Sequence, residues 1–476
     1  MARTAKKEKA LTPEEKLAQA LVPDVEQPYR VPENWCWVTL GGITQVISGG
    51  TPSSGNPDYY ENGDIPWITP ADLSNYNDIY ISNGAKSITQ IGLNKSSARL
   101  LPKGTVCLSS RAPIGYVAIA ANPLATNQGF KSFLPSPAYN PLYLYWYLKG
   151  NKQLLEDRAS GTTFLELSGS KAATVEFPLA PLAEQQRIVD RIESLFAKLD
   201  EAKEKAQAVV SGFEHRKAAI LHKAFTGELT EKWRLAKAIE HSSWENTTVG
   251  KCSELITKGA SPKWQGVSYT SDSTQTLFVT SENVREGFFD WTKEKYLDNT
   301  INDIQKRSIL HKGDVLVNIV GASIGRSAIF DRDCLANTNQ AVCLVRVKDN
   351  LNNEYLCHYF NSPFALMYYD DNKVETARAN ISLTNISDMP ISLPTLQEQI
   401  EIVRRLNELI ERELTIKRAI EQVIDQIDTM KKSILARAFR GELGTNDPND
   451  ESAVELLKRV LKEDVCVHEF IKKNNL

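Results

Sequence analysis

The sequence lacks any long uninterrupted run of hydrophobic residues. No segment holds about 18 consecutive apolar residues, the length that a membrane-spanning helix needs. The first residues are polar and basic, and no apolar stretch follows them, so the N-terminus does not resemble a secretory signal peptide. We therefore expect a cytoplasmic protein with no membrane partner.

Paired cysteines and an excess of basic residues are also missing. The seven cysteines are scattered with no C-x-x-C pair, so neither a disulfide framework nor a zinc site is indicated, and we expect reduced, mostly buried thiols. The formal net charge is -3, whereas proteins that bind DNA over their whole surface are usually basic. Any surface that binds nucleic acid must therefore be local.

What the sequence does contain is a long-range internal repeat. The 476 residues, of which 42% are hydrophobic and 24% charged, are enough for two or three globular domains. Leu182–Val189 matches Leu396–Val403, an offset of 214 residues (182 to 396). Ile220–Leu229 recurs at the same offset as Ile434–Leu443. The segments between these motifs are therefore equally long.

Both of these segments carry the spacing of a coiled coil. Apolar residues follow each other at steps of four and three residues from Ile188 to Ile220 and again from Ile402 to Ile434. Each copy ends at a glycine suited to a helix C-cap, Gly227 or Gly441. A helix over 184–224 would be roughly 60 Å long at about 1.5 Å per residue. Each copy therefore predicts a long helix.

Two charged residues interrupt the apolar seam, Arg216 in the first copy and Glu413 in the second. Charges at a heptad seam commonly specify register. In a parallel pair at the repeat offset, Arg216 would face Met430. In an antiparallel pair centred near residue 207, Arg216 would face Glu413 and Leu199 would face Met430. We favour the antiparallel pair, because it brings the two opposite charges together.

The segments that precede the two long helices are also related, although more weakly. Lys103–Gly115 is similar to Lys312–Gly325, and Thr126-Asn127-Gln128 matches Thr338-Asn339-Gln340. Both segments alternate short β-rich runs with Gly, Pro, Asn and Ser turns, and both end in a helix-like stretch. We therefore expect an α+β fold: two α/β domains separated by two long helices that pair as an antiparallel coiled coil, with a pseudo-two-fold internal repeat.

The expected order along the chain is domain, helix, domain, helix. A short helix precedes them, with Thr12 as its N-cap, Pro13 at its first position and acidic residues in its first turn. The predicted boundaries are an N-terminal arm (1–30), domain 1 (31–180), a central helix (181–230), a linker (231–243), domain 2 (244–393), a C-terminal helix (394–444) and a tail (445–476) that holds a helix at 453–461.

This order, the L-x-E-Q-x-x-I-V start of each long helix and its A-F-x-G-E-L end resemble the specificity subunits of Type I restriction and modification systems. The resemblance covers Val31 to about Leu443. It implies that each domain recognises one half of a split double-stranded DNA target as a target recognition domain, and that the long helices set the distance between the halves. It also implies docking of two adenine-N6 methyltransferase subunits, joined by motor-nuclease subunits for restriction. This chain would have no catalysis and no cofactor of its own, with S-adenosylmethionine, ATP and magnesium on the partner subunits.

The predicted geometry suits that assignment. Two similar but non-identical domains at opposite ends of a stiff antiparallel helix pair would present their DNA-reading faces in inverted orientation, as two half-sites require. Because the domains differ more than the helices do, the half-sites should differ in sequence. A helix of the predicted length would span roughly 17 base pairs at about 3.4 Å each, which is an upper bound on the separation.

Side chains that discriminate bases are forked or amide groups on loops, usually Arg for guanine and Asn or Gln for adenine. In domain 1 the candidates for DNA contact are Ser109, Ser110, Arg111, Lys131, Thr162, Thr163 and Lys171, the last as a phosphate contact. In domain 2 they are Asn318, Arg326, Asn339, Arg378 and Asn380, with Lys258 and Lys263 as cations that position the DNA backbone. Each has an alternative role, because a loop Lys or Arg is commonly solvated and a loop Asn often caps a turn. The shared T-N-Q segments are expected to support the fold, and the aromatic residues at 143–147 are expected in the core.

Two alternatives remain to be weighed. Asn140-Pro-Leu-Tyr143 differs by one residue from the N-P-P-Y signature of adenine methyltransferases, but no glycine-rich cofactor loop follows a strand in the required order. The second alternative is a coiled-coil scaffold whose two domains bind protein. The affinity of a scaffold would not depend on base sequence, whereas that of a DNA reader would.

Overall fold

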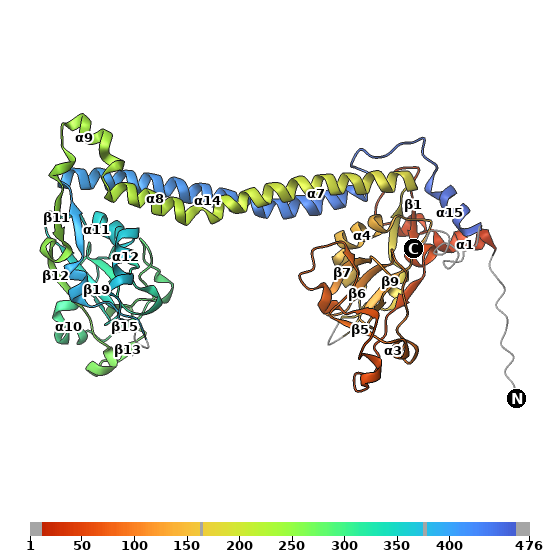
Figure 1. Ribbon diagram of the computed structural model, residues 1–476, viewed down its shortest axis with the longest axis horizontal. Helices are drawn as coiled ribbons and strands as arrows, with labels where there is room; N and C mark the ends of the chain where they lie inside the picture. The colour runs from red at the N-terminus through yellow and green to blue at the C-terminus, as the bar shows by residue number, and fades with distance from the viewer. Residues whose placement is uncertain (1–11, 162–164, 375–377, 463–476) are drawn as a thin grey trace. The chain divides into compact units, whose positions relative to one another are not determined.

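The computed structural model describes residues 12–161, 165–374 and 378–462, which form two compact units (Figure 1). Unit 1 lies within Met1–Glu204 and Ile424–Leu476, and unit 2 is Lys205–Val423. Each long helical segment is therefore divided between the units. The N-terminal arm and the C-terminal tail both belong to unit 1, a grouping that the linear order of predicted domains did not specify.

Unit 1 contains domain 1, which is built on two sheets and one separate strand pair. The sheet orders are β2-β9-β6-β7-β4 and β5-β3-β8, and β1 pairs with β10. The strands are β1 Cys36–Thr39, β2 Val46–Ser48, β3 Ile65–Ile68, β4 Tyr80–Ile81, β5 Lys86–Ile88, β6 Val106–Ser110, β7 Ile114–Ala120, β8 Ala125–Thr126, β9 Phe130–Phe133 and β10 Glu176–Leu179. The shorter helices are α1 Pro13–Ala20, α2 Leu40–Ile43, α3 Gln90–Asn94, α4 Pro141–Gly150, α5 Lys152–Arg158, α6 Gly169–Ala173 and α15 Ala453–Lys462. Thr12 is the N-cap of α1, as predicted, and it also forms a capping box with Glu15.

Unit 2 contains domain 2, which has a similar plan. The sheet orders are β12-β19-β16-β17 and β13-β15-β14-β18, and β11 pairs with β20. The strands are β11 Glu245–Thr248, β12 Ser253–Lys258, β13 Tyr269–Thr270, β14 Thr276–Val279, β15 Tyr296–Leu297, β16 Val315–Asn318, β17 Ser327–Ile329, β18 Ala336–Thr338, β19 Val342–Val347 and β20 Pro390–Leu393. The shorter helices are α9 Glu231–Lys237, α10 Ile301–Ile304, α11 Asn353–Phe360, α12 Pro363–Asn372 and α13 Leu383–Asp388. The predicted linker is therefore partly helical.

The central strands of both domains are buried on both faces, which explains their nearly continuous apolar sequence. On β6, Val106 and Leu108 contribute to one core while Cys107 contributes to another. On β16, Val315 and Leu316 divide between two cores in the same way. Because successive side chains of a strand point to opposite faces, each sheet separates two hydrophobic cores.

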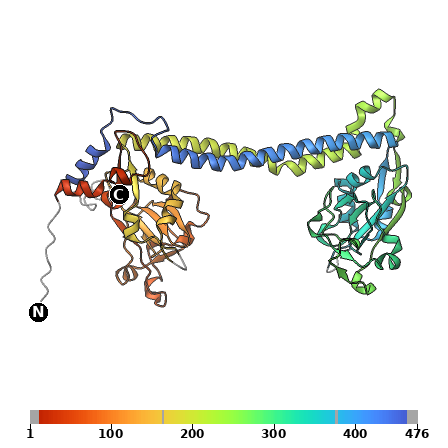
Figure 2. The same cartoon turned by 180° about the vertical axis from the view of Figure 1, so that it is seen from behind.

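The long helical segments run antiparallel within each unit (Figures 1 and 2). They are α7 Leu182–Ser211 with α8 Phe213–Phe225, and α14 Leu396–Ala438. In unit 1, Asp200 pairs with Lys431 at 2.5 Å and Lys203 pairs with Asp428 at 2.7 Å, so numbers rise along α7 as they fall along α14. Gly212 separates α7 from α8, and the prediction of one uninterrupted helix over 184–224 was wrong at that residue.

In unit 2 the two charged seam residues meet. Arg216 Nε on α8 donates a hydrogen bond to Glu413 Oε2 on α14 at 2.7 Å, which is the contact expected of antiparallel helices. One turn away, Lys417 lies over the ring of Phe213, 4.8 Å from its centroid. That the two charges set the register stays a prediction.

The E-Q pair at the start of each long helix holds a domain to that helix. In unit 1, Gln185 Nε2 donates to the carbonyl oxygens of Ala138 and Ala180, and its Oε1 accepts from the Asn140 amide. In unit 2, Gln399 makes the equivalent three hydrogen bonds, with the Asn350 and Pro394 carbonyls and the Asn352 amide. Both glutamines are fully buried, so this part of the motif is structural.

The A-F-x-G-E-L ends of the helices close the domains. Phe225 at the end of α8 packs edge-on against Tyr355 and Tyr359 in unit 2. In unit 1, Phe439, which follows α14, packs edge-on against Tyr147 and at a tilt against Tyr143. The glycines after these helices have the predicted left-handed backbone, with φ of 81° at 227 and 73° at 441. Tyr143 to Tyr147 are all buried, which confirms their place in the core.

Candidate nucleic-acid interface

Two of the serines predicted to contact DNA in domain 1 lie inside the fold. Ser109 and Ser110 end β6 and are fully buried. The Ser109 hydroxyl donates to the Pro113 carbonyl and accepts from the Tyr116 amide, and the Ser110 hydroxyl donates to the Gly129 carbonyl. Their assignment to DNA contact is corrected, because these hydroxyls fix the turn that follows β6.

Arg111 follows the two serines and is half-buried. Its backbone bridges Glu166, and its side chain has no hydrogen bond or ion pair within the described part of the chain. Lys131 on β9 lies nearby but is only 6% exposed, with its ammonium 3.6 Å from Glu166 Oε1. Lys131 is thus already neutralised, and its assignment as a DNA contact is corrected. Arg111 remains the strongest candidate in domain 1.

The other candidates in domain 1 are less informative. Lys171 is half-buried on α6, where its backbone amide is capped by the Ser168 hydroxyl. Thr162 and Thr163 lie outside the described residues. No described contact therefore places Lys171 beside Arg111.

Asn318 in domain 2 is also buried, so its assignment as a DNA contact is corrected. Its Nδ2 donates to the carbonyls of Ser281 and Val284 at 3.1 and 3.3 Å. Asn339 is half-buried and its Oδ1 caps the following turn by accepting from the Ala341 amide. Asn380 is half-buried, and its backbone bridges Val320 and Val374. These three residues mainly organise loops.

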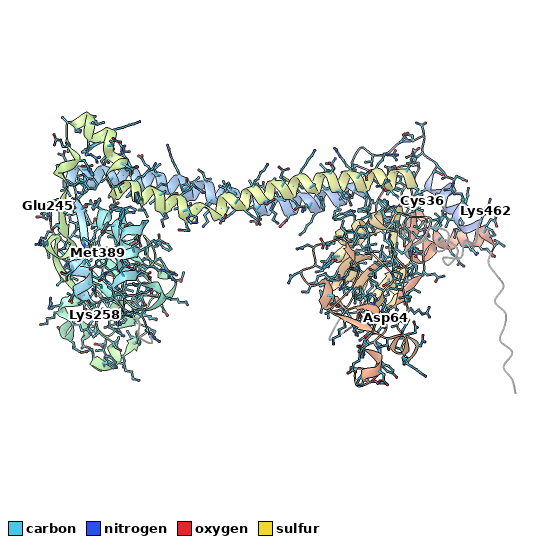
Figure 3. The ribbon with its side chains drawn as sticks, in the orientation of Figure 1. Cys36, Asp64, Glu245, Lys258, Met389 and Lys462 are labelled. Carbon is cyan, nitrogen blue, oxygen red and sulfur yellow. The ribbon has the colours of Figure 1, made fainter. Side chains whose placement is uncertain are left out.

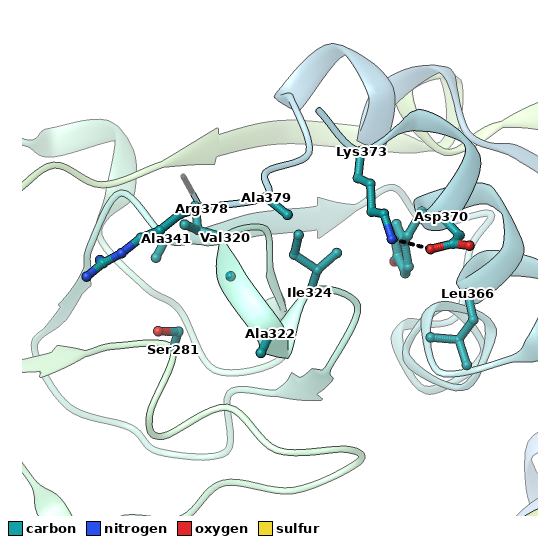
Figure 4. A pocket seen from close by; sticks show the side chains of 12 residues that line it. Ser281, Val320, Ala322, Ile324, Ala341, Leu366, Asp370, Lys373, Arg378 and Ala379 are labelled. Carbon is teal, nitrogen blue, oxygen red and sulfur yellow. Dashed lines mark hydrogen bonds and ion pairs between the residues drawn. The ribbon is translucent and has the colours of Figure 1, made fainter. Parts of the chain in front are cut away.

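Four candidate cations of domain 2 are exposed: Lys258, Lys263, Arg326 and Arg378. Lys258 ends β12, on the same side of domain 2 as Met389 and Glu245 in this view but further from the long helices than either (Figure 3). Arg378 lines a cavity of about 710 Å³ together with Ser281, Val320 and Ala341 (Figure 4). These four side chains are thus accessible to solvent, which a DNA contact requires.

Burial controls the titration of two groups in the interior of domain 2. Burial raises the pKa of the Cys343 thiol to about 12, and the nearby Lys258 ammonium opposes that rise. Burial also raises the pKa of Tyr369 well above its usual value of 10.0. Tyr369 lines the cavity, and its buried hydroxyl has no hydrogen-bond partner within the described part of the chain. Both groups are therefore neutral at physiological pH.

Sequence reasoning missed three exposed side chains. Trp264 is 82% exposed and follows the candidate Lys263. Gln128 and Gln340 are exposed at the tips of the two T-N-Q segments, while Thr126 and Thr338 are buried. Because the T-N-Q segment recurs in both domains, its glutamine could have been selected as a candidate for DNA contact. From the sequence, the whole segment was instead assigned to support of the fold.

The structure also bears on the methyltransferase-like motif. Asn140 is the N-cap of α4, and its side chain accepts from the Leu142 amide. Tyr143 is fully buried and donates to the Pro178 carbonyl. Both side chains thus hydrogen-bond to the backbone of their own domain, which makes the motif an element of the fold. In the described residues no three His, Cys, Asp or Glu side chains are placed to hold a metal ion, and no helix is long and apolar enough to cross a membrane.

Comparison with known families identifies the class of protein. The family model for the Type I restriction modification DNA specificity domain matches residues 32–210 and 270–426. These segments make up more than half of the chain. The chain therefore belongs to the family of specificity subunits of Type I restriction-modification systems.

Individual relatives extend this result. The specificity subunit of the EcoKI enzyme of Escherichia coli (strain K12) is 24% identical over 463 residues, which are 91% of this chain and 96% of that subunit. The MjaIX specificity subunit of Methanocaldococcus jannaschii is 44% identical over 183 residues, but these are 38% of this chain and 42% of that subunit. The crystal structure of the HsdS subunit from Thermoanaerobacter tengcongensis has a similar fold, with a TM-score of 0.62 at 18% identity, covering 88% of this chain and 100% of that chain.

Proposed function

We propose that this chain recognises a split, asymmetric DNA target, with domain 1 on one half-site and domain 2 on the other. The main observation in support is that the two domains share one fold but have different side chains in equivalent loops. Gln185 and Gln399 make equivalent hydrogen bonds, whereas the backbone position of Arg111 in domain 1 is taken by Val320 in domain 2. Domains with one plan and different loops suit half-sites that differ in sequence.

The long helices are proposed to form an antiparallel coiled coil that relates the two domains by a pseudo-two-fold axis. The ion pairs of Asp200 with Lys431 and of Arg216 with Glu413 support antiparallel pairing within each unit. The equivalent packing of Phe225 and Phe439 supports the internal repeat. Such a pair would fix the spacer between the half-sites, because its length does not depend on the DNA.

The exposed cations of domain 2 are proposed to contact DNA. Lys258 and Lys263 would bind phosphates and set the position of the domain, while Arg326 and Arg378 can reach base edges or phosphates. Because the net charge is -3, we expect the isolated chain to bind DNA weakly and to need its partners to enclose the duplex.

Those partners are proposed to be two adenine-N6 methyltransferase subunits, with motor-nuclease subunits added for restriction. Ile416 and Val423 of α14 are 46% and 47% exposed in unit 2, and apolar side chains on a helix surface suit contact with another protein. In this proposal the chain carries no catalysis, and S-adenosylmethionine, ATP and magnesium bind to the partner subunits.

A map of N6-methyladenine at base resolution tests the proposal. Cells that carry this chain and its methyltransferase would be compared with cells that carry the methyltransferase alone. We expect a split motif that disappears when the chain is absent. Methylation that is active but unchanged without the chain would contradict the proposal and favour a protein-binding scaffold.

A further inference from the structure

The two domains present different residues at one equivalent backbone position. In domain 1, Arg111 follows β6 and bridges Glu166. In domain 2, Val320 follows β16 and bridges Asn380. The two bridges have equivalent partners, because Glu166 also bridges Ser160 and Asn380 also bridges Val374. We call the position held by Arg111 and Val320 the bridge site.

The strand that pairs with the one before the bridge site also carries different residues in the two domains. Leu108 of β6 is opposite Lys131 of β9, and Val317 of β16 is opposite Cys343 of β19. The residue behind the bridge site is thus a lysine in domain 1 and a cysteine in domain 2. The side chain on this neighbouring strand is therefore charged in domain 1 and neutral in domain 2.

In domain 1 the bridge site offers an unused guanidinium. Lys131 and Glu166 neutralise each other, whereas the Arg111 side chain has no hydrogen bond or ion pair to any residue that the structure describes. A guanidinium carries five N–H donors, and leaving them without acceptors in a half-buried place is unfavourable. The base edge that accepts from a forked donor is guanine, through its O6 and N7 atoms.

In domain 2 the bridge site opens into a cavity of about 710 Å³, whose lining has an apolar part beside Val320 and a charged part made by Asp370, Lys373 and Arg378 (Figure 4). The apolar part is formed by Val320, Ala322, Ile324 and Ala341. In the major groove the apolar group on the base edges is the 5-methyl group of thymine.

We propose that the bridge site is where the two domains recognise different bases: Arg111 binds a guanine in one half-site, and the cavity beside Val320 receives a thymine methyl group in the other. This inference rests on the proposed function, because it requires that both domains bind DNA. It adds to that function the position and the chemistry of one base-specific contact in each half-site.

Base analogues test the inference without changing the protein. The target is first taken from the methylation map, and binding of the assembled complex with its methyltransferase subunits is then measured on duplexes with one altered base each. Guanines are replaced singly by 7-deazaguanine, which lacks the N7 acceptor, and thymines by uracil, which lacks the methyl group. We expect one guanine of one half-site to weaken binding about fivefold or more when replaced. We expect one thymine of the other half-site to weaken it about fourfold.

Variants connect these effects to the bridge site. Arg111→Ala should make binding insensitive to the 7-deazaguanine, and Val320→Thr, which keeps the side-chain volume, should remove the uracil effect. Lys103→Ala, before β6, and Leu335→Arg, before β18, are controls at exposed positions away from the bridge site, and both should leave the analogue effects unchanged. Val320→Arg should further transfer the preference of domain 2 from thymine to guanine at that base pair.

The outcomes separate this inference from the proposed function. A split target at which no guanine or thymine replacement weakens binding would overturn the inference alone, as would analogue effects that persist in Arg111→Ala and Val320→Thr. A half-site for domain 2 composed only of G·C pairs would also overturn it. Methylation that does not depend on base sequence would overturn the proposed function itself.

Discussion

Reversing the charge of Arg216 or of Glu413 should weaken unit 2, and reversing both should restore most of the loss. The pair is partly exposed, at 37% and 20% of the side chains, so its attraction is that of a surface ion pair, about 1 kcal/mol at most. Arg216→Glu or Glu413→Arg replaces this attraction with a repulsion of similar size. Each single change should therefore lower the free energy of unfolding by about 1–2 kcal/mol.

The exchange of both charges should recover all but about 0.5–1 kcal/mol of the wild-type value. It falls short because Arg216 also donates to the Val209 carbonyl at 3.1 Å, and a glutamate at 216 cannot replace that hydrogen bond. Urea titration of the full chain, followed by circular dichroism at 222 nm, measures the shift. Glu411→Arg is the matched control on the same helix, because Glu411 pairs with Arg418.

Two results would refute the reasoning. If the losses of Arg216→Glu and Glu413→Arg add in the double variant, the two side chains do not meet. If Glu411→Arg rescues Arg216→Glu as well as Glu413→Arg does, the effect depends on net charge and not on register. The rescue should also shrink in high salt, because partly exposed charges are screened.

Three further predictions follow from buried or exposed groups. Burial lowers the pKa of His358 below its usual 6.5, and a hydrogen bond with Asn407 opposes that shift. The stability that the neutral imidazole contributes is therefore present above pH 6.5 and is lost as the pH falls through the lowered pKa. The loss of unfolding free energy from pH 7.5 to pH 5 should be smaller in His358→Gln, and an equal loss would exclude this histidine as the cause. Glu398→Gln should cost about 3 kcal/mol in a urea titration, because it leaves the buried Arg234 without its counter-charge; a loss below about 1 kcal/mol would contradict the structure. Iodoacetamide should label the exposed Cys334 of the native chain before the buried thiols, as mass spectrometry of its peptides can check.

The long helices could be predicted from the sequence because their signals are local. The heptad spacing from Ile188 onward and the glycines at 227 and 441 each determine the backbone conformation of nearby residues. The structure has a helix over the first and a left-handed backbone at both glycines. The break at Gly212 was missed, although a glycine inside a helical pattern is a weak signal for one. The distribution of the arm and the tail into unit 1 could not be predicted, because it depends on contacts such as Tyr29 with Phe439 that no local pattern encodes.

The candidate site was predicted less well, and the reason is burial. Residue type and turn position selected Ser109, Ser110 and Asn318, but the sheets place all three inside their domains, where their polar groups bind backbone atoms. Arg111 directly follows Ser110 in the sequence, and Val320 lies two residues after Asn318. Their equivalence became visible only when the strand pairing aligned the two domains across an insertion.

The most direct test of the central claim, that each domain reads its own half of the target, is a methylation map of a chain altered in one domain. Arg326→Ala and Arg378→Ala together remove two exposed cations of domain 2 and leave domain 1 unchanged. The account predicts a methylated motif in which one half relaxes or is lost, while the other half and the spacer remain. A motif that changes equally in both halves, or that remains complete while binding is weakened, would contradict it.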